Sequence, residues 1–405
     1  MTDYTDQRIA ALETQIALLS RALSQGQTLS STEPAADLSA ALADAIVALE
    51  PLRPLLEDET VNDILINGPN HVFVERAGKL ERTSLTFASD AEVFRIAQSI
   101  GAQAGRAVDV NRPLLDARLP DGSRVNIIAP PLSVDGTSIS IRKFSKHSIT
   151  LDTMRDQGNI SSGLAEFLKV VARCRMNIII AGGTGSGKTT LLNAISHHID
   201  ADERIVTIED AAELKLQQPH IVRLETRPVR AGRREDEVTI RDLMRNALRM
   251  RPDRIIIGEV RGAEAFDMMQ AMNTGHEGSL TTVHANHPRD AMARLENMIT
   301  MANLNLPAHA IRSQIASAIH LVVQISRMRD GMRRVAYVSE VVGMESDVIT
   351  MQELFAFQTK GEGTDGKLIG DFKWSGIMPR FLRRVAYYGE ADRLSNALGV
   401  KLPKL

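Results

Sequence analysis

Gly182-Gly183-Thr184-Gly185-Ser186-Gly187-Lys188-Thr189 is the stretch that decides the fold of this chain of 405 residues. It matches the pattern G-x-x-x-x-G-K-[ST] at every position, with an apolar segment before it and a helical segment, starting at Thr190, after it. Glycines let backbone N–H groups close around phosphate, and the first turn of the helix adds a positive dipole. We therefore expect residues 183–190 to form a nucleotide-binding loop.

Two side chains of this loop should carry most of its chemistry. The Lys188 ammonium is expected to reach the β- and γ-phosphates, and the Thr189 hydroxyl is an expected ligand for Mg²⁺. ATP and Mg²⁺ are therefore the expected cofactors. We also expect Lys188 to be partly exposed and to lie outside the hydrophobic core.

Around the loop, short apolar segments alternate with helical segments. The expected buried strands are 177–181, 204–208, 221–224, 254–258, 279–283 and 321–325. Because helical patterns separate most of these strands, the sequence predicts an α/β fold with a doubly wound, mostly parallel sheet.

Changes of pattern divide the chain into five expected parts. Residues 1–54 form an N-terminal helical extension and linker, and residues 55–145 form a smaller α+β N-terminal domain. Residues 146–162 connect it to a P-loop ATPase domain, 163–343. The last part, 344–405, is rich in glycine, and we expect it to form short strands and turns packed on the larger domain.

Composition limits the compartment and the partners. The 48 lysines and arginines are balanced by 50 aspartates and glutamates, so a formal charge of −2 gives no global attraction for nucleic acid or anionic lipid. A single cysteine, Cys174, excludes an intramolecular disulfide and fits a reducing cytoplasm. The chain has no run of about 18 apolar residues and no signal-peptide pattern at its start. We expect a cytosolic protein.

Carboxylates follow two of the expected strands. Glu259 ends the apolar strand that begins at Arg254, where a carboxylate can meet Mg²⁺ or polarise the attacking water. Glu209 and Asp210 follow strand 204–208, and Glu213 comes four residues after Glu209. Because the carboxyl ends of parallel strands open onto one crevice, Glu209 is expected to support Mg²⁺, directly or through water. For Asp210, capping a helix is an equally open interpretation.

Histidines and arginines supply further candidates. His276 and His284 flank the expected strand 279–283, and we interpret His284 as a sensor that reports the γ-phosphate to the subunit interface. Arg124 and Arg142 lie on expected strands of the small domain. Arginine suits a γ-phosphate contact because its guanidinium is always charged and fork-shaped. From the residues alone, a solvated strand face remains the alternative for both arginines.

Together these motifs resemble those of the type II/type IV secretion and pilus ATPases, and most closely those of the CpaF-type tight-adherence (Flp) pilus assembly ATPases. Four motifs correspond: the phosphate loop, the acidic pair at Glu209, the strand ending in Glu259, and the histidine box ending in His284. The stretches 118–124 and 355–379 are also similar. The resemblance covers the chain from Leu55 onward.

The resemblance implies a RecA-like P-loop motor domain and a smaller N-terminal domain that close on ATP, in a ring that is a homohexamer. It implies that Glu259 activates water, that His284 relays the phosphate state, and that Arg124 and Arg142 reach the terminal phosphate. The implied function is a cytoplasmic ATPase, peripheral at the inner-membrane face. It would move pilin subunits through inner-membrane platform proteins and touch the pilin only indirectly.

Three other functions stay open. A type IV secretion ATPase that transfers protein or DNA is the nearest alternative. A RecA-like nucleic-acid motor belongs to a different class, and the balanced charge argues against direct binding of nucleic acid. A small-molecule phosphotransferase would use the same phosphate loop but would release ADP only with its substrate.

Overall fold

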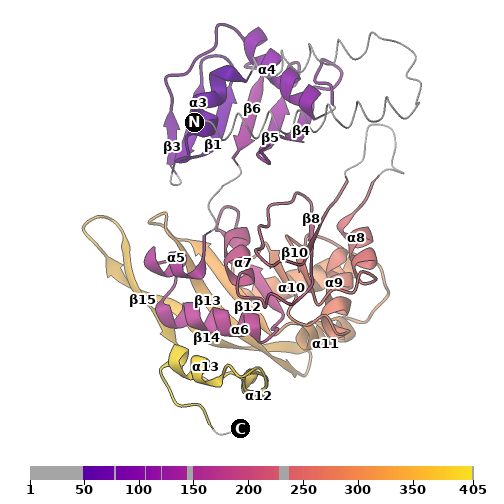
Figure 1. Ribbon diagram of the computed structural model, residues 1–405, viewed down its shortest axis with the longest axis vertical. Coiled ribbons are helices and arrows are strands. Elements are labelled where there is room, and N and C mark those ends of the chain that lie inside the picture. The colour runs from indigo at the N-terminus through magenta and orange to yellow at the C-terminus, as the bar shows by residue number, and fades with distance from the viewer. Residues whose placement is uncertain are drawn as a thin grey trace. The chain divides into compact units, whose positions relative to one another are not determined.

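The computed structural model describes residues 49–76, 79–104, 106–119, 121–143, 149–227 and 237–403. The chain separates into two compact units, Met1–Lys146 and His147–Leu405 (Figure 1). The helices expected over residues 1–48 lie outside the described residues. A short turn η1 (Glu50–Leu52) and helix α3 (Arg53–Glu57) open the described chain, so the boundary expected at 54/55 falls within a helix.

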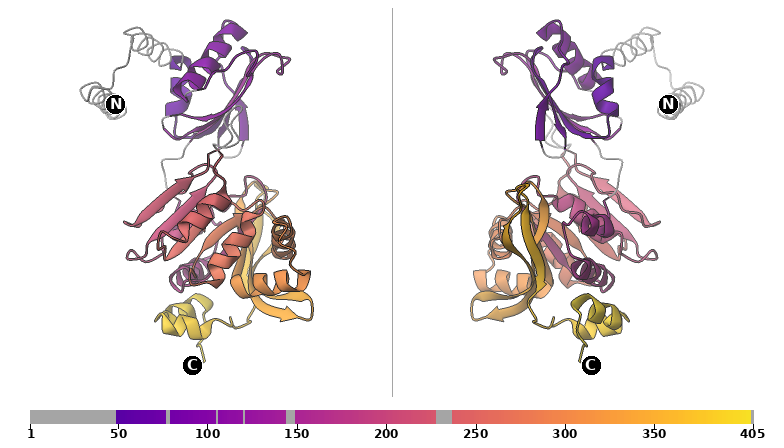
Figure 2. Two further views of the ribbon diagram at one scale, coloured as in Figure 1. Left: turned by 90° about the vertical axis from the view of Figure 1, so that its right-hand side faces the viewer. Right: turned by 90° about the vertical axis from the view of Figure 1, so that its left-hand side faces the viewer.

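Unit 1 is built on an antiparallel sheet of six strands in the order β3-β2-β1-β6-β5-β4. The strands are β1 (Val61–Asn67), β2 (Val72–Arg76), β3 (Lys79–Arg82), β4 (Leu114–Arg118), β5 (Arg124–Ile128) and β6 (Ser138–Arg142). Successive side chains of a strand point to opposite faces, so Ile64 and Ile66 of β1 share one buried face. Helix α4 (Asp90–Gln103) covers that face, as Figure 2 shows.

Unit 2 contains a nine-stranded sheet in the order β15-β14-β13-β12-β7-β11-β10-β8-β9. The six strands from β12 to β9 are parallel. They are β7 (Ile178–Ala181), β8 (Ile205–Glu209), β9 (Ile221–Glu225), β10 (Arg254–Ile257), β11 (Leu280–Val283) and β12 (Leu321–Arg327). The predicted α/β fold with a mostly parallel sheet is confirmed.

Helices cover both faces of the parallel strands. Within β7, Ile178 and Ile180 belong to the core shared with α6 (Ser162–Arg173) and α7 (Lys188–Ser196). Ile179 and Ala181 belong to the core on the other face. The helices there are α8 (Ile240–Ala247), α9 (Glu264–Asn273), α10 (Pro288–Thr300) and α11 (Ala308–Ala318). Burial on both faces explains the uninterrupted apolar runs of these strands.

The expectation of short strands and turns after Met344 is wrong. Strands β13 (Arg333–Glu345) and β14 (Val348–Glu362) have 13 and 15 residues. With β15 (Leu368–Trp374) they continue the same sheet in antiparallel pairing, so the boundary expected at 343/344 falls inside β13. Gly343 and Gly361 lie at register shifts inside these strands, where glycine marks a bulge and not a turn.

The chain ends in two short helices, α12 (Leu382–Tyr387) and α13 (Ala391–Leu398), drawn in yellow in Figure 2. Leu394 and Leu398 of α13 join the core that includes α6 and α7, and Arg393 donates to Glu166 of α6 at 2.9 Å. Another helix of unit 2, α5 (Leu151–Asp156), adds Leu151 to this core. No helix in the described ranges has both the length and the apolar character needed to cross a membrane.

Candidate functional site

The phosphate loop joins the carboxyl end of β7 to α7. Gly187, directly before α7, has φ +98°, a left-handed conformation that glycine adopts without strain. At Gly182 a Cβ atom would lie 2.5 Å from the backbone oxygen of Ile325, so any larger residue would collide with β12. Arg333, on β13, donates to the backbone oxygen of Gly185 at 2.9 Å. Two of the predicted glycines are thus required by backbone geometry.

Lys188 is 8% exposed, so the expectation of a partly exposed side chain is wrong, although the residue belongs to none of the described hydrophobic core clusters. Its Nζ donates to the backbone oxygen of Gly183 at 3.0 Å and lies 3.4 Å from Nε2 of His284. Burial lowers the pKa of the Lys188 ammonium, and the nearby Glu259 carboxylate opposes part of that shift. A buried ammonium with so few acceptors favours an anion at this position.

Glu259 follows β10 at the same edge of the sheet. Its Oε1 lies 2.9 Å from Nε2 of His284, and its Oε2 accepts a hydrogen bond of 2.7 Å from Nη2 of Arg261. The side chain is only 18% exposed. The structure therefore brings Lys188, Glu259 and His284 together beside the phosphate loop, although 96 residues of chain separate Lys188 from His284.

His284 comes directly after β11, whereas His276 precedes that strand and lies at its other end. Burial lowers the pKa of the His284 ring, and the positive charges of Lys188, Arg261 and Arg294 lower it further. The negative charge of Glu259 opposes this shift. The His284 ring is therefore neutral near pH 7, and one of its nitrogens donates while the other accepts.

Glu209 is the last residue of β8 and is 2% exposed. Its Oε2 accepts from the backbone N–H groups of Glu213 (2.7 Å) and Leu214 (2.9 Å). Its Oε1 has no hydrogen-bond partner within the part of the chain that the structure describes. Burial raises the pKa of the carboxyl to about 7, and the two N–H groups oppose this shift. A free, buried carboxylate oxygen suits water bound to a metal.

Asp210 does not cap a helix. No helix begins at this residue, and residues 210–220 form irregular structure, so the capping interpretation is wrong. The carboxylate instead accepts from the hydroxyl of Thr226 at 3.3 Å, and its Oδ2 lies 3.8 Å from Nη1 of Arg261. Asp210 thus belongs to the same group of charges as Glu259.

The register of unit 1 brings its two candidate arginines together. Arg124 on β5 is paired directly with Arg142 on β6, so both side chains leave the same face of the sheet. Arg142 is 65% exposed at its side chain, and its Nε lies 3.2 Å from the carboxylate of Asp63. Like charges directly opposite one another destabilise a sheet, and an anion bound between them would relieve this repulsion.

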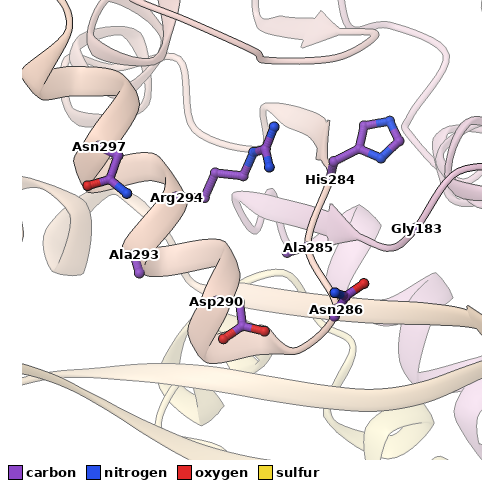
Figure 3. A pocket seen from close by; sticks show the side chains of 8 residues that line it. All are labelled: Gly183, His284, Ala285, Asn286, Asp290, Ala293, Arg294 and Asn297. Carbon is purple, nitrogen blue, oxygen red and sulfur yellow. The ribbon is translucent and has the colours of Figure 1, made fainter.

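An open pocket of about 460 Å³ borders the phosphate loop. It is lined by Gly183, His284, Ala285, Asn286, Asp290, Ala293, Arg294 and Asn297. Figure 3 shows the Arg294 side chain extending from α10 on the same side as the His284 ring. Sequence reasoning missed Arg261, which directly follows the carboxylate motif, and Arg294, which no motif marks.

The residues present fit a nucleoside triphosphate with Mg²⁺. The glycine backbone ahead of α7 can supply N–H donors, and Lys188 supplies a buried positive charge. The unpartnered Oε1 of Glu209 and the hydroxyl of Thr189, the second residue of α7, are oxygen ligands of the kind that Mg²⁺ prefers.

Comparison with known proteins gives consistent matches. Residues 46–361 match the family model described as type II/IV secretion system protein. The chain is 39% identical to a putative conjugal transfer protein of Mycobacterium tuberculosis, across 71% of this chain and 83% of the relative. It is 33% identical to the type IV secretion system protein VirB11 of Bartonella henselae, across 71% and 90%. The solved ATPase DotB of Legionella pneumophila has the same fold, with a TM-score of 0.53 at 22% identity across 75% of this chain and 82% of that chain.

Proposed function

The chain belongs to the type II/IV secretion system protein family as an ATP-hydrolysing enzyme, and from this premise we propose that its hydrolysis drives the transfer of protein or DNA through a type IV secretion machine. Relatives named for conjugal transfer and for type IV secretion support this assignment. They favour it over assembly of a tight-adherence pilus, the function that the sequence resemblance placed first.

One observation supports the enzymatic part of this proposal above all others. The imidazole of His284 lies between a buried ammonium and a carboxylate beside the phosphate loop: its Nε2 is 3.4 Å from Nζ of Lys188 and 2.9 Å from Oε1 of Glu259. A loop that only anchored a phosphate would have no use for a carboxylate beside it. A carboxylate at that point can orient and polarise a water molecule for attack on phosphorus.

The roles follow from these positions. Residues 183–190 hold the phosphates of ATP, with Lys188 as the charge and Thr189 as a ligand of the metal. Glu209 holds the metal through water, Glu259 acts on the attacking water, and His284 couples the two ends of the site. Bound Mg²⁺ adds positive charge at the phosphates, as it does in phosphoryl transfer generally.

Arg124 and Arg142 are the proposed link between hydrolysis and movement. Their direct cross-strand pairing gives unit 1 two guanidinium groups on one face, which suits an anion with several oxygens. Such a contact exists with the γ-phosphate and is lost with ADP. Unit 1 would therefore close on ATP and open after hydrolysis.

We further propose a homohexamer that works at the cytoplasmic face of the inner membrane, bound to membrane proteins of the secretion machine. Direct binding of nucleic acid is not part of this proposal, because the charge of the whole chain is only −2. Transferred DNA would contact other components of the machine.

Assembly of a tight-adherence (Flp) pilus is the second candidate function. The matched family model ends at residue 361, within β14, so β15 and helices α12 and α13 lie beyond it. This additional segment overlaps residues 355–379, the stretch that resembles the CpaF-type branch. A pilus motor would push pilin subunits through platform proteins with the same site.

A strain whose only copy carries Glu259→Gln separates the two functions. We expect delivery of protein or DNA to recipient cells to stop while surface pili, counted by electron microscopy, remain. Loss of pili with normal delivery would contradict type IV secretion and favour the pilus. Arg289→Ala, an exposed arginine on α10 that is outside the pocket, is the matched control.

A further inference from the structure

Arg294 is a cation on α10 that lines the pocket beside the phosphate loop. It is exposed, and Gly183 and His284 line the same pocket. No described residue forms a hydrogen bond or ion pair with its side chain. Arginines of neighbouring helices, in contrast, form ion pairs. Arg241 of α8 donates to Asp267 at 2.7 Å, and Arg312 of α11 donates to Glu296 at 3.0 Å.

Arg294 forms no ion pair with Asp290, the carboxylate at pairing distance along the same helix, among the described residues. Asp290 precedes Arg294 by four residues, the spacing at which an acid and a base pair along a helix. No such pair is present among the described ion pairs, and Figure 3 shows the guanidinium extending away from Asp290, toward the strand end that carries His284. The side chain is therefore directed at the loop and not at its own helix.

Several cations lie close to the His284 ring. The positive charges of Lys188, Arg261 and Arg294 all act on the His284 ring, and the carboxylates of Glu259 and Asp210 lie close to Arg261. Oε2 of Glu259 is already bound by Arg261. Among the described residues, neither Lys188 nor Arg294 forms an ion pair with a carboxylate, and both lie beside the phosphate loop.

We propose that Arg294 binds the terminal phosphate of ATP from the α10 side of the loop, next to His284, and so distinguishes ATP from ADP. This inference rests on the proposed function, since it places a second ligand-binding residue in the same nucleotide site. A planar guanidinium offers parallel N–H donors to two phosphate oxygens. With ADP these donors have no acceptor. Because Arg294 belongs to the same unit as the loop, its contact does not depend on Arg124 or Arg142.

The test compares the affinities of the full chain for ATPγS and for ADP, by displacement of a fluorescent nucleotide. Arg294→Ala should weaken binding of ATPγS by about tenfold or more, as expected for loss of a charge-assisted hydrogen bond, and leave the ADP affinity unchanged. Arg294→Lys keeps the positive charge but loses the forked guanidinium. Its affinity for ATPγS should lie between those of the wild type and Arg294→Ala. Arg289→Ala, on the same helix, should bind both nucleotides as the wild type does.

Equal effects of Arg294→Ala on ATPγS and ADP, or no effect on either, would overturn the role of Arg294. So would a changed oligomeric state with normal discrimination between the nucleotides, because Arg294 would then be an interface residue. A wild-type protein that binds neither nucleotide would contradict the proposed function itself, and the inference with it. If the wild type binds nucleotide, Lys188→Ala abolishes that binding and Arg294→Ala has no effect, the proposed function is supported and the role of Arg294 is refuted.

Discussion

Nε2 of His284 lies 2.9 Å from Oε1 of Glu259 and 3.4 Å from Nζ of Lys188. Oε1 of Glu259 has no hydrogen-bond partner among the described residues. A protonated Nε2 that turned toward it could donate to Glu259, whereas Nε2 without a proton can accept from Lys188. The same nitrogen cannot do both at once, so the tautomer of His284 selects one contact. Phosphate that draws Lys188 away would free the ring to donate to Glu259. The imidazole therefore connects Lys188, which we propose to bind phosphate, with Glu259, which we propose to activate water.

Replacing His284 tests this connection. His284→Ala should reduce kcat by about tenfold or more, because it removes the ring that lies 2.9 Å from Oε1 of Glu259, while KM for ATP changes little. Lys188 and the glycines, which bind the phosphates, remain in place. Steady-state kinetics at saturating Mg²⁺ would measure both constants. A raised KM with unchanged kcat would show that His284 only helps to bind ATP.

Removing the Lys188 ammonium should abolish nucleotide binding without unfolding the protein. A buried charge with few partners destabilises the fold, so Lys188→Ala should keep or slightly raise the melting temperature. Binding of fluorescent ATP, together with thermal unfolding, checks both halves of this prediction. Ordinary ATP hydrolysis by the folded variant would rule out the phosphate loop as the site.

Arg142→Ala should prevent the closure of unit 1 on ATP without preventing the binding of nucleotide. Since the arginine is proposed to meet only the γ-phosphate, ADP affinity should stay near normal while most turnover is lost. Distances between labels on the two units should then be the same with ATPγS and with ADP. Asp63→Asn is the matched control, because it removes the ion-pair partner of Arg142 and leaves the arginine in place. A variant that still closes on ATPγS would refute the sensor role.

The stability of unit 2 should fall in acid because of His320. Its Nδ1 accepts from the backbone N–H of Asn177 at 2.8 Å, a bond that a protonated ring cannot accept. Burial lowers the pKa of His320 to about 4 from an ordinary value of 6.5. Between pH 6.5 and pH 4 this histidine is protonated in the unfolded chain and not in the folded chain. Its contribution to stability is therefore complete above pH 6.5 and is lost as the pH falls toward 4.

This group alone should lower the free energy of unfolding by up to about 1.4 kcal/mol per pH unit over that range. Urea unfolding at pH 7 and pH 5 measures the difference. His320→Gln should show a smaller loss between the two pH values, and His309→Gln, an exposed histidine of α11, should show the same loss as the wild type. Equal losses in all three proteins would contradict the role of His320.

The parallel core could be predicted because its signals are local. Buried strands such as Arg254–Ile257 are continuous apolar runs, and the phosphate loop is a contiguous pattern between a strand and a helix. Strands β13 to β15 could not be predicted in the same way. Their glycines, such as Gly343, sit at bulges that read in sequence as turns, and only pairing with β12 shows that the sheet continues.

Residue types of the site could be predicted, but their contacts could not. The motifs place Glu259 and His284 after strands and Lys188 at the start of a helix, whereas the burial of Lys188 depends on packing by segments distant in sequence. The pairing of Arg124 with Arg142 depends on strand register, which no local pattern specifies. In sequence Arg294 looks like any exposed arginine of a helix. Only the structure shows that no described residue pairs with its side chain and that it lines the pocket beside the phosphate loop.

The most direct measurement asks whether Glu259 acts in hydrolysis and not in the binding of ATP. Glu259→Gln keeps the size of the side chain and its hydrogen bonding but removes the charge that polarises water. ATP hydrolysis should fall by about 10²-fold or more, while the affinity for ATP in Mg²⁺ stays within a few-fold of the wild type. Turnover and nucleotide affinity measured on the same purified variant decide the matter. An affinity lost as completely as in Lys188→Ala would show that Glu259 mainly holds the metal, and would contradict its role in activating water.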